Sequence, residues 1–299
     1  MACPHEPAGQ FVMETFLKDS VFAPYTIEET MITVQANVRL RCLSIVQHSS
    51  ARRPAVVFIP GWITQMVAWR EVITAMVPHY DVYYIETREK ISAMVDGKTA
   101  YTVQAIARDI RECVHHLELS ADHFVLFGSS LGATAILEAC SQQELQPRAL
   151  ILVAPNAVFR VPLYWRLIVR GFYPGWYALL KPVVKAYLKH FRLNVQADDQ
   201  QFEKYSRALD AADPWKLKKA VLAFARYQVW PILKDIEPPV LLVAASQDKL
   251  HEPQNLQRMY RELLKAHWVD LETNQATHSK EVVKAMNRFM GAIDINGRV

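Results

Sequence analysis

The sequence lacks several features that would place it in a specialised class of protein. Its 299 residues contain four cysteines, and no two of them have the spacing of a metal site, a redox pair or a disulfide framework. No apolar run reaches the roughly 18 residues that a membrane-spanning helix needs. The first residues show no basic leader followed by an apolar stretch, so we expect no signal peptide. These absences favour a reduced, cytoplasmic protein, and no cluster of side chains implies a metal or an organic cofactor.

A strong charge of one sign is also missing. The 34 Lys and Arg residues against 30 Asp and Glu residues give a net charge of +4, which is too small a total to indicate nucleic-acid binding. Hydrophobic residues make up 51% of the chain and charged residues 21%, as in an ordinary globular protein. The length allows a sizeable core.

Strand patterns and helix patterns alternate along most of the chain. Residues 1–28 are expected to be a helical or irregular lead-in, and residues 30–46 predict two strands that turn near Ala36-Asn37. The alternation that follows predicts a mostly parallel sheet with helices on both faces. We predict strands at 55–59, 81–85, 124–127, 149–153, 240–244 and 267–271, and helices at 64–77, 100–118, 131–140, 254–264 and 280–291.

The alternation stops between Ala154 and Ile236, where only helical and aromatic segments occur. The simplest interpretation is an α/β domain interrupted by a helical insertion. We expect a first part of the core at 1–154, a helical cap at 155–236 and a second part of the core at 237–299.

The segment from Gly128 to Gly132 reads Gly-Ser-Ser-Leu-Gly and joins a predicted strand to a predicted helix. In such a tight turn the central residue, Ser130, is held in a strained conformation with its hydroxyl exposed. The flanking glycines let the strand and the helix approach each other. The helix N-terminus behind the turn favours developing negative charge. We therefore expect Ser130 to be a nucleophile, the alternative being a turn without chemical function.

A serine nucleophile needs a general base, and the base needs a carboxylate that orients it. Asp248 follows the predicted strand 240–244, and His278 lies in a polar loop, 274–279, after the last strand. Both should therefore lie at the same sheet edge as Ser130, where ligand sites of α/β sheets occur. We predict His278 as the base and Asp248 as the acid.

Other residues compete for these roles. His251 is the closest rival for the base, although it follows the predicted acid too closely to reach over the nucleophile easily. Asp270 and Glu272 are weaker rivals for the acid because they lie within or at the end of the last strand. The end of strand 149–153 is another position for an acid, but Asn156 stands there.

A tetrahedral intermediate also needs two backbone N–H donors. One is expected from Leu131, directly after the nucleophile. The other is expected from Trp62, in the Pro60-Gly61-Trp62 turn that follows the first predicted buried strand.

These motifs together resemble the α/β-hydrolase fold superfamily, over roughly residues 30–154 and 237–291. The resemblance rests on Gly128-Ser129-Ser130-Leu131-Gly132, Pro60-Gly61-Trp62, Asp248 and His278, in the superfamily's order. It implies a hydrolase with a cap, and the serine counts against the haloalkane dehalogenases and epoxide hydrolases of that superfamily, which use Asp. Two departures stand out. Pro60-Gly61 replaces a usual His-Gly pair, which removes a side-chain anchor, and Ser129 replaces a frequent His or Trp.

The insertion has an unusual composition. Residues 145–197 contain no Asp or Glu but eight Lys and Arg and nine aromatic residues, so the chain's net charge of +4 leaves −4 for the rest. A helix over 180–192 would place basic and apolar side chains on different faces. The basic face has Lys181, Lys185, Lys189 and Arg192, and the apolar face has Leu180, Val184, Tyr187, Leu188 and Phe191.

Three interpretations of this segment stay open. The apolar face packs on the sheet domain while the lysines are solvated; residues 160–192 make peripheral contact with an anionic membrane; or the segment binds an anionic group on an acyl substrate.

The sequence therefore predicts a serine hydrolase that cleaves a carboxylic ester with a hydrophobic acyl chain, such as a monoacylglycerol or a lysolipid. A C–C bond hydrolase, a thioesterase or a perhydrolase with the same triad is the alternative, and a non-catalytic ligand receptor is a further one. The expected partner is a small or lipid-like substrate, with no nucleic acid, and the sequence leaves the oligomeric state open.

Overall fold

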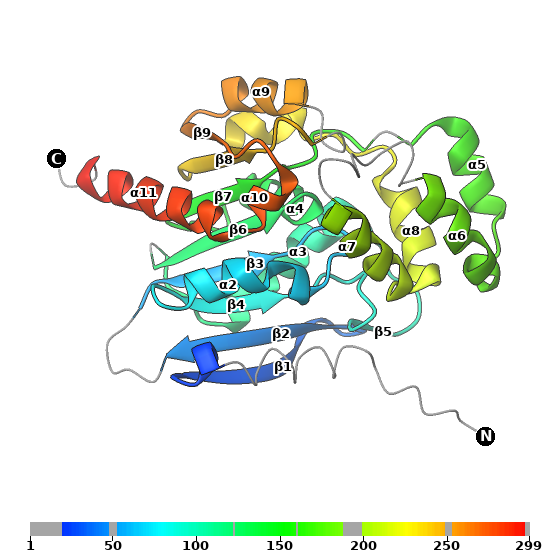
Figure 1. Cartoon of the computed structure of the whole chain (residues 1–299), viewed down its shortest axis with the longest axis horizontal. Helices are drawn as coiled ribbons and strands as arrows, with labels where there is room; N and C mark the ends of the chain where they lie inside the picture. The colour runs from blue at the N-terminus through cyan, green and yellow to red at the C-terminus, as the bar shows by residue number, and fades with distance from the viewer. Residues whose placement is uncertain are drawn as a thin grey trace.

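Short apolar runs of the sequence form the centre of one sheet. The computed structural model describes residues 20–47, 53–121, 123–159, 161–187, 199–248 and 253–296. Within them, a nine-stranded sheet has the order β1-β2-β4-β3-β6-β7-β8-β9, with β5 beside β2 (Figure 1). Its strands are β1 (Tyr25–Gln35), β2 (Val38–Gln47), β3 (Ala55–Ile59), β4 (Asp81–Ile85), β5 (Met94–Val95), β6 (Phe124–Ser129), β7 (Ala149–Val153), β8 (Val240–Ala244) and β9 (Ala266–Asp270).

The sheet is parallel from β4 to β9 and antiparallel at its β1–β2 edge. The predicted hairpin is confirmed, since Gln35 pairs with Val38 around Ala36-Asn37. The lead-in predicted for 1–28 is wrong over its last residues, because pairing of Tyr25 with Gln47 extends β1. Residues 1–19 lie outside the described part. The two-residue strand β5 was not predicted, because its two residues carry no alternation that could be detected.

The helices follow the predicted positions, with one difference at the predicted site. Residues 274–279, expected to be a loop, contain the one-turn helix α10, because Thr273 caps it by accepting a hydrogen bond from Ala276 N. The core helices are η2 (Met66–Trp69), α2 (Arg70–Met76), α3 (Val103–His116), α4 (Leu131–Cys140), α9 (Pro253–Glu262), α10 (Asn274–Thr277) and α11 (Lys280–Asn296), with η1 (Ser20–Phe22) before β1.

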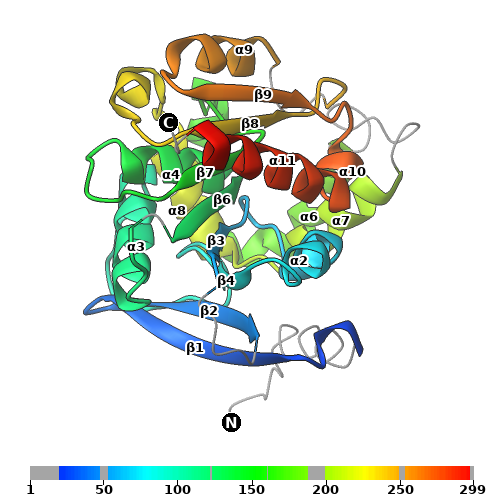
Figure 2. The same ribbon diagram turned by 90° about the vertical axis from the view of Figure 1, so that its left-hand side faces the viewer.

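Helices cover both faces of the sheet. Apolar side chains of α3, α4 and α9 pack on one face, and those of η2, α2 and α11 pack on the other. Figure 2 shows α2 and α11 in front of the sheet, with α3 and α4 to one side. Each central strand is buried along its whole length. The mostly parallel α/β fold class is therefore confirmed.

The insertion between β7 and β8 lies at one end of the molecule (Figure 1). Asp213 caps α8 by accepting hydrogen bonds from Trp215 N and Lys216 N, with Pro214 at the first helical position, as its Asp-Pro pair indicates. The elements are α5 (Leu163–Gly171), η3 (Pro174–Trp176), α6 (Tyr177–Tyr187), α7 (Asp199–Asp210), α8 (Pro214–Phe224) and η5 (Trp230–Asp235). Among the described residues, no helix is both long enough and apolar enough to span a membrane.

The interpretation that apolar residues of the insertion pack on the sheet domain fails for its outer helices. Among the described helices of the insertion, α8 reaches the core through Ala220 and Phe224, which are 0% and 2% exposed, and η5 reaches it through Leu233. No residue of α5 is buried, because α5 packs on α8 and not on the sheet. Lys181 and Lys185 are not simply solvated either: each forms an ion pair with Asp210. Lys189, Arg192, Leu188 and Phe191 lie outside the described residues.

Candidate active site

Ser130 occupies the turn between β6 and α4 with a backbone conformation that side chains rarely adopt. Its φ is 50° and its ψ is −116°. Its N–H donates to Val153 O over 2.8 Å, and its carbonyl accepts from both the backbone N–H and the hydroxyl of Thr134, each over 3.0 Å. These bonds hold the strained turn in place.

Glycine is required at the two flanking positions because backbone atoms of neighbouring segments approach them closely. A Cβ on Gly132 would lie 2.2 Å from Ile59 O, and a Cβ on Gly128 would lie 2.8 Å from the backbone of Ala133. Both distances are too short for any side chain. Gly128 and Gly132 therefore let α4 press against β3 and β6, as the motif predicts.

The side chain of Asn156 contacts the predicted nucleophile directly. Its Nδ2 donates to Ser130 Oγ over 2.7 Å. Its backbone is fixed by Thr134, whose Oγ1 accepts from Asn156 N over 2.9 Å and donates to Asn156 O over 3.0 Å. Sequence reasoning considered this position only for a carboxylate. A polar residue at the carboxyl end of the strand beside β6 was the signal that could have identified it.

His278 follows α10, and its neighbours Asn274 and Trp69 help to orient its ring. Its Nδ1 lies 2.9 Å from the carbonyl oxygen of Asn274, and its ring stacks on Trp69 with centroids 4.0 Å apart. Trp69 is 0% exposed and packs edge-on against Phe58 and Phe127, so it is a fixed surface for the imidazole. Trp69 is a supporting residue that the sequence did not indicate.

Asp248 lies beyond β8 and is 7% exposed. Its Oδ2 accepts a hydrogen bond of 3.1 Å from Asn274 Nδ2. Asn274 therefore contacts the predicted acid through its side chain and the predicted base through its carbonyl. Sequence reasoning missed this connection, because Asn274 was expected to belong to a loop.

The two rival acids form hydrogen bonds within and between the segments that follow β8 and β9. Asp270 Oδ1 accepts from the N–H groups of Ser246 and Glu272. Burial acts to raise the pKa of Asp270, but hydrogen bonding from the Ser246 side chain, together with these N–H groups, outweighs it and holds the pKa below its usual value. Glu272 Oε2 accepts from Gln247 Nε2 over 3.4 Å. The rival base His251 lies outside the described residues.

The predicted oxyanion turn lies against the nucleophile. A Cβ on Gly61 would be 3.3 Å from Ser130 Cβ. Leu131 is the first residue of α4, so its N–H is one of the donors that have no acceptor within the helix. The indole of Trp62 contacts Phe224 of α8 edge-on at 6.0 Å, which joins the turn to the insertion.

These residues lie at the carboxyl ends of neighbouring parallel strands. Ser130 follows β6, Asn156 follows β7, Asp248 follows β8 and His278 follows β9, at one edge of adjacent strands. Across the described ranges, no group of three or more His, Cys, Asp or Glu side chains could hold a metal ion.

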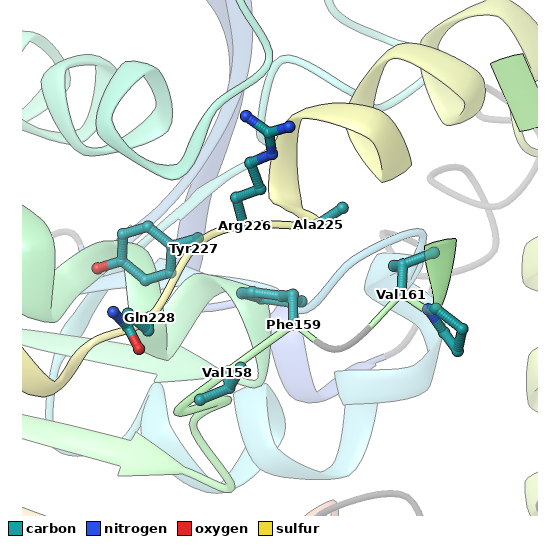
Figure 3. A pocket seen from close by; sticks show the side chains of 8 residues that line it. Val158, Phe159, Val161, Ala225, Arg226, Tyr227 and Gln228 are labelled. Carbon is teal, nitrogen blue, oxygen red and sulfur yellow. The ribbon is translucent and has the colours of Figure 1, made fainter. Parts of the chain in front are cut away.

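An open cavity of about 580 Å³ lies at the base of the insertion (Figure 3). None of the predicted site residues lines it, so it does not define the site of chemistry. Its walls are Val158, Phe159, Val161, Pro162, Ala225, Arg226, Tyr227 and Gln228.

Comparisons with known proteins agree with this architecture. The family model for hydrolases described as serine aminopeptidase, S33, matches residues 51–279. No curated protein sequence matches the chain.

Several solved structures share the fold at low sequence identity. A thermophilic esterase from Thermogutta terrifontis is 16% identical, with a TM-score of 0.71 over 89% of this chain and 99% of that one. A hydrolase from Pseudomonas aeruginosa is 17% identical, with a TM-score of 0.69 over 89% of this chain and 97% of that one. A membrane phospholipase A, described as a bacterial virulence factor, is 15% identical, with a TM-score of 0.71 over 95% of this chain and 92% of that one.

Proposed function

Because the chain belongs to the serine aminopeptidase S33 family of α/β-fold hydrolases, we propose that it cleaves carboxylic esters through an acyl-enzyme on Ser130. The enzyme class predicted from the sequence, an α/β-fold hydrolase, agrees with that membership. The observation that carries the proposal is the strained turn at Ser130: its hydroxyl accepts a hydrogen bond from Asn156, and its Cβ lies beside Gly61.

In this mechanism His278 removes the Ser130 proton as the hydroxyl attacks the ester carbonyl. Asp248 stabilises the imidazolium that forms, and the ring is held by Asn274 O and Trp69. The N–H groups of Trp62 and Leu131 receive the developing oxyanion. The alcohol leaves with the proton from His278, and water then releases the acyl group by the same steps.

Asn156 has a supporting role that follows from its contact. Its amide occupies a lone pair of Ser130 Oγ, which leaves the hydroxyl proton to be donated to a base. The same N–H stabilises the alkoxide character that Oγ gains during attack.

A hydrophobic acyl chain suits the surroundings of the turn. Trp62 contacts Phe224, and Phe224 contacts Phe159 with ring centroids 5.3 Å apart, so a row of aromatic rings runs from the oxyanion turn into the insertion. The esterase and the phospholipase A among the similar structures support ester chemistry in this fold. A thioesterase, a C–C hydrolase or a perhydrolase would use the same residues.

The test is turnover of chromogenic esters from acetate to palmitate, with thioesters and aminoacyl anilides assayed in parallel. We expect the highest kcat/KM on a medium or long acyl ester, and labelling of the protein by a fluorophosphonate. Ser130→Ala should lose both, with turnover reduced roughly 10³- to 10⁶-fold. Ser129→Ala is the matched control, because it removes the adjacent buried hydroxyl and should keep the labelling.

Asn156→Ala should lower kcat by about tenfold to a hundredfold, the worth of a hydrogen bond to a charged group. Absence of turnover on every ester, together with an unreactive Ser130, would contradict the proposal. A binding function that survives Ser130→Ala would then favour the receptor alternative.

A further inference from the structure

The outer helices of the insertion present an apolar surface to solvent. Ten of the sixteen large hydrophobic side chains that are exposed in the described residues lie in the insertion, on α5, on α6, at the start of α8 and around η3. We call this the aromatic surface. It consists of Leu163, Tyr164, Trp165, Leu167, Ile168, Tyr173, Trp176, Leu179, Val183 and Trp215, which are 45–78% exposed.

Direct contacts join neighbouring parts of the surface. Tyr173 contacts Trp176 and Trp215 with ring centroids 6.1 and 5.6 Å apart. Lys218 of α8 donates to the carbonyls of Arg170 and Phe172, which fixes the end of α5 beside α8. Single exposed hydrophobic residues are normal, but a contiguous patch of this kind marks an interaction site.

The positive charge beside the aromatic surface indicates what kind of partner it binds. Arg166 and Arg170 are one turn apart on α5, and neither forms an ion pair with any residue that the structure describes. No Asp or Glu occurs between residues 145 and 197. Trp and Tyr side chains beside basic ones are typical of surfaces that lie at the boundary between lipid headgroups and acyl chains.

A second copy of the chain fits this surface less well. A two-fold interface would place the same patch against itself. The arginines of both copies would then face each other without an acidic residue from this segment to pair with them. The helices α5 and α6, which carry most of the surface, lie at the outer end of the molecule (Figure 1).

We propose that the aromatic surface docks this hydrolase on anionic lipid bilayers, with α5, η3 and α6 lying in the headgroup region. Docking is independent of the chemistry at Ser130.

Co-sedimentation of the full chain with phosphatidylcholine vesicles, with and without phosphatidylglycerol, tests this. We expect binding to the anionic vesicles that weakens with salt. Arg166→Gln with Arg170→Gln should lower partitioning by about fivefold per arginine on anionic vesicles and leave neutral ones unchanged. Trp165→Ser with Trp176→Ser and Leu179→Ser should lower it on both.

Leu264→Ser is the matched control, since Leu264 is 71% exposed but lies outside the insertion, and it should bind like the unaltered chain. Equal partitioning of all variants, or failure of the unaltered chain to bind anionic vesicles, would overturn the proposal. Self-association that the same substitutions abolish would assign the surface to a second copy.

A separate observation concerns Lys90, which lies beside the oxyanion turn. It is 7% exposed, and its Nζ donates to Gly61 O over 2.5 Å and to Thr64 O over 2.9 Å. Its own segment is held by Lys216, whose Nζ donates to Lys90 O and Ala93 O. A buried ammonium is costly, so its placement on this turn requires a reason.

Gly61 O and Trp62 N–H belong to the same planar, trans peptide. An ammonium on the oxygen fixes the plane of that peptide and therefore the direction of the N–H. It also draws electron density toward the oxygen, which makes the N–H a stronger donor. Pro60 offers no side-chain anchor at this turn, and Lys90 supplies one from a distant segment.

The geometry points to Lys90 as the positioning residue of the oxyanion hole, an inference that rests on the proposed function. Lys90→Met should lower kcat on a soluble short ester by about a hundredfold with little change in KM. It should weaken inhibition by a boronic acid, which forms a tetrahedral adduct, by a similar factor. Lys90→Arg should restore part of both, and Lys90→Gln should restore less, since it keeps donors without charge.

Lys218→Met is the matched control, because Lys218 also donates to two backbone carbonyls but lies away from the turn. If the Lys90 variants do not fold, Lys216→Met decides: a lower kcat at unchanged KM is expected, and an unchanged kcat overturns the inference. Activity that survives Ser130→Ala would defeat the proposed function itself. An inactive Ser130→Ala beside a fully active, folded Lys90→Met would defeat only the role of Lys90.

Discussion

The sheet and the outer helices of the insertion differ in what they do with their apolar side chains: the sheet buries them and the outer helices expose them. Residues of β3, β6, β7 and β8 are buried throughout, whereas α5 has no buried residue although six of its nine residues are apolar. Both segments carry Leu, Ile and Val, so hydrophobicity alone does not decide which side chains are covered. In the sheet it stabilises the fold, and on α5 it remains available for contact with a partner.

The largest difference in stability is expected between substitutions at two glycines, one crowded by backbone atoms and one with open space around it. Gly132→Ala should prevent folding or destabilise the protein by roughly 4 kcal/mol or more, because its Cβ would overlap Ile59 O. Gly171→Ala, at the end of α5, meets nothing within 4 Å and should be neutral or stabilising by up to about 1 kcal/mol. Chemical denaturation measures both. Comparable losses would contradict the distinction between the two regions.

Leucines from the two regions should differ next. Leu152→Ala in β7 removes a side chain that is 0% exposed and should cost about 2–5 kcal/mol of unfolding free energy. Leu167→Ala on α5, 62% exposed, should change it by no more than about 0.5 kcal/mol. Thermal melting in the absence of lipid provides the comparison. A large loss for Leu167→Ala would mean that α5 has a covering partner in solution.

Tyr227 lies where the insertion meets the sheet domain, and its substitution tests how firmly the two are joined. Its hydroxyl donates to Glu138 Oε2 over 2.6 Å, which ties the end of the insertion to the nucleophile helix α4. Tyr227→Phe should cost about 1–3 kcal/mol, since Glu138 loses its buried donor. A variant as stable as the unaltered chain would show that this bond does not hold the insertion in place.

The smallest effect is expected within the insertion, at Asp210. Hydrogen bonds from Lys185 and then Lys181 hold the pKa of Asp210 below its usual value. A carboxyl whose pKa is depressed by folding contributes stability above its unfolded pKa, and this contribution is lost as the pH falls through the folded pKa. Asp210→Asn should therefore lower stability at neutral pH by about 0.2–1 kcal/mol, as for a solvent-exposed pair. The difference from the unaltered chain should vanish in acid, once the pH has fallen below the depressed pKa of Asp210. A difference that persists there would point to packing instead of charge.

Much of the core could be predicted because buried parallel strands require continuous apolar runs. Ala149–Val153 and Leu131–Cys140 were predicted with the bounds that the structure has. The edge at which Ser130, Asp248 and His278 gather followed from the same alternation, since carboxyl ends of parallel strands share one side. The supporting residues were not predictable in this way. Asn156, Trp69, Asn274 and Lys90 act through the direction of one side chain or one carbonyl, and periodicity carries no such information.

For the outer helices, the sequence predicted secondary structure but not packing. The sequence predicted helical segments in the insertion, one of them over 180–192 where the structure has α6 (Tyr177–Tyr187), but not what they face, because amphipathicity does not specify a partner. The pairing of Lys181 and Lys185 with Asp210 depends on how α6 and α7 pack.

By itself, the sequence determined the α/β order of elements, the strained serine turn and the absence of acidic residues from 145 to 197, because each is a local pattern of residue types. Only the tertiary structure decided that Asn156 contacts Ser130, that Lys90 holds the oxyanion turn and that the aromatic surface faces outward. These are contacts between segments far apart in the chain, and they exist only once the sheet brings those segments together.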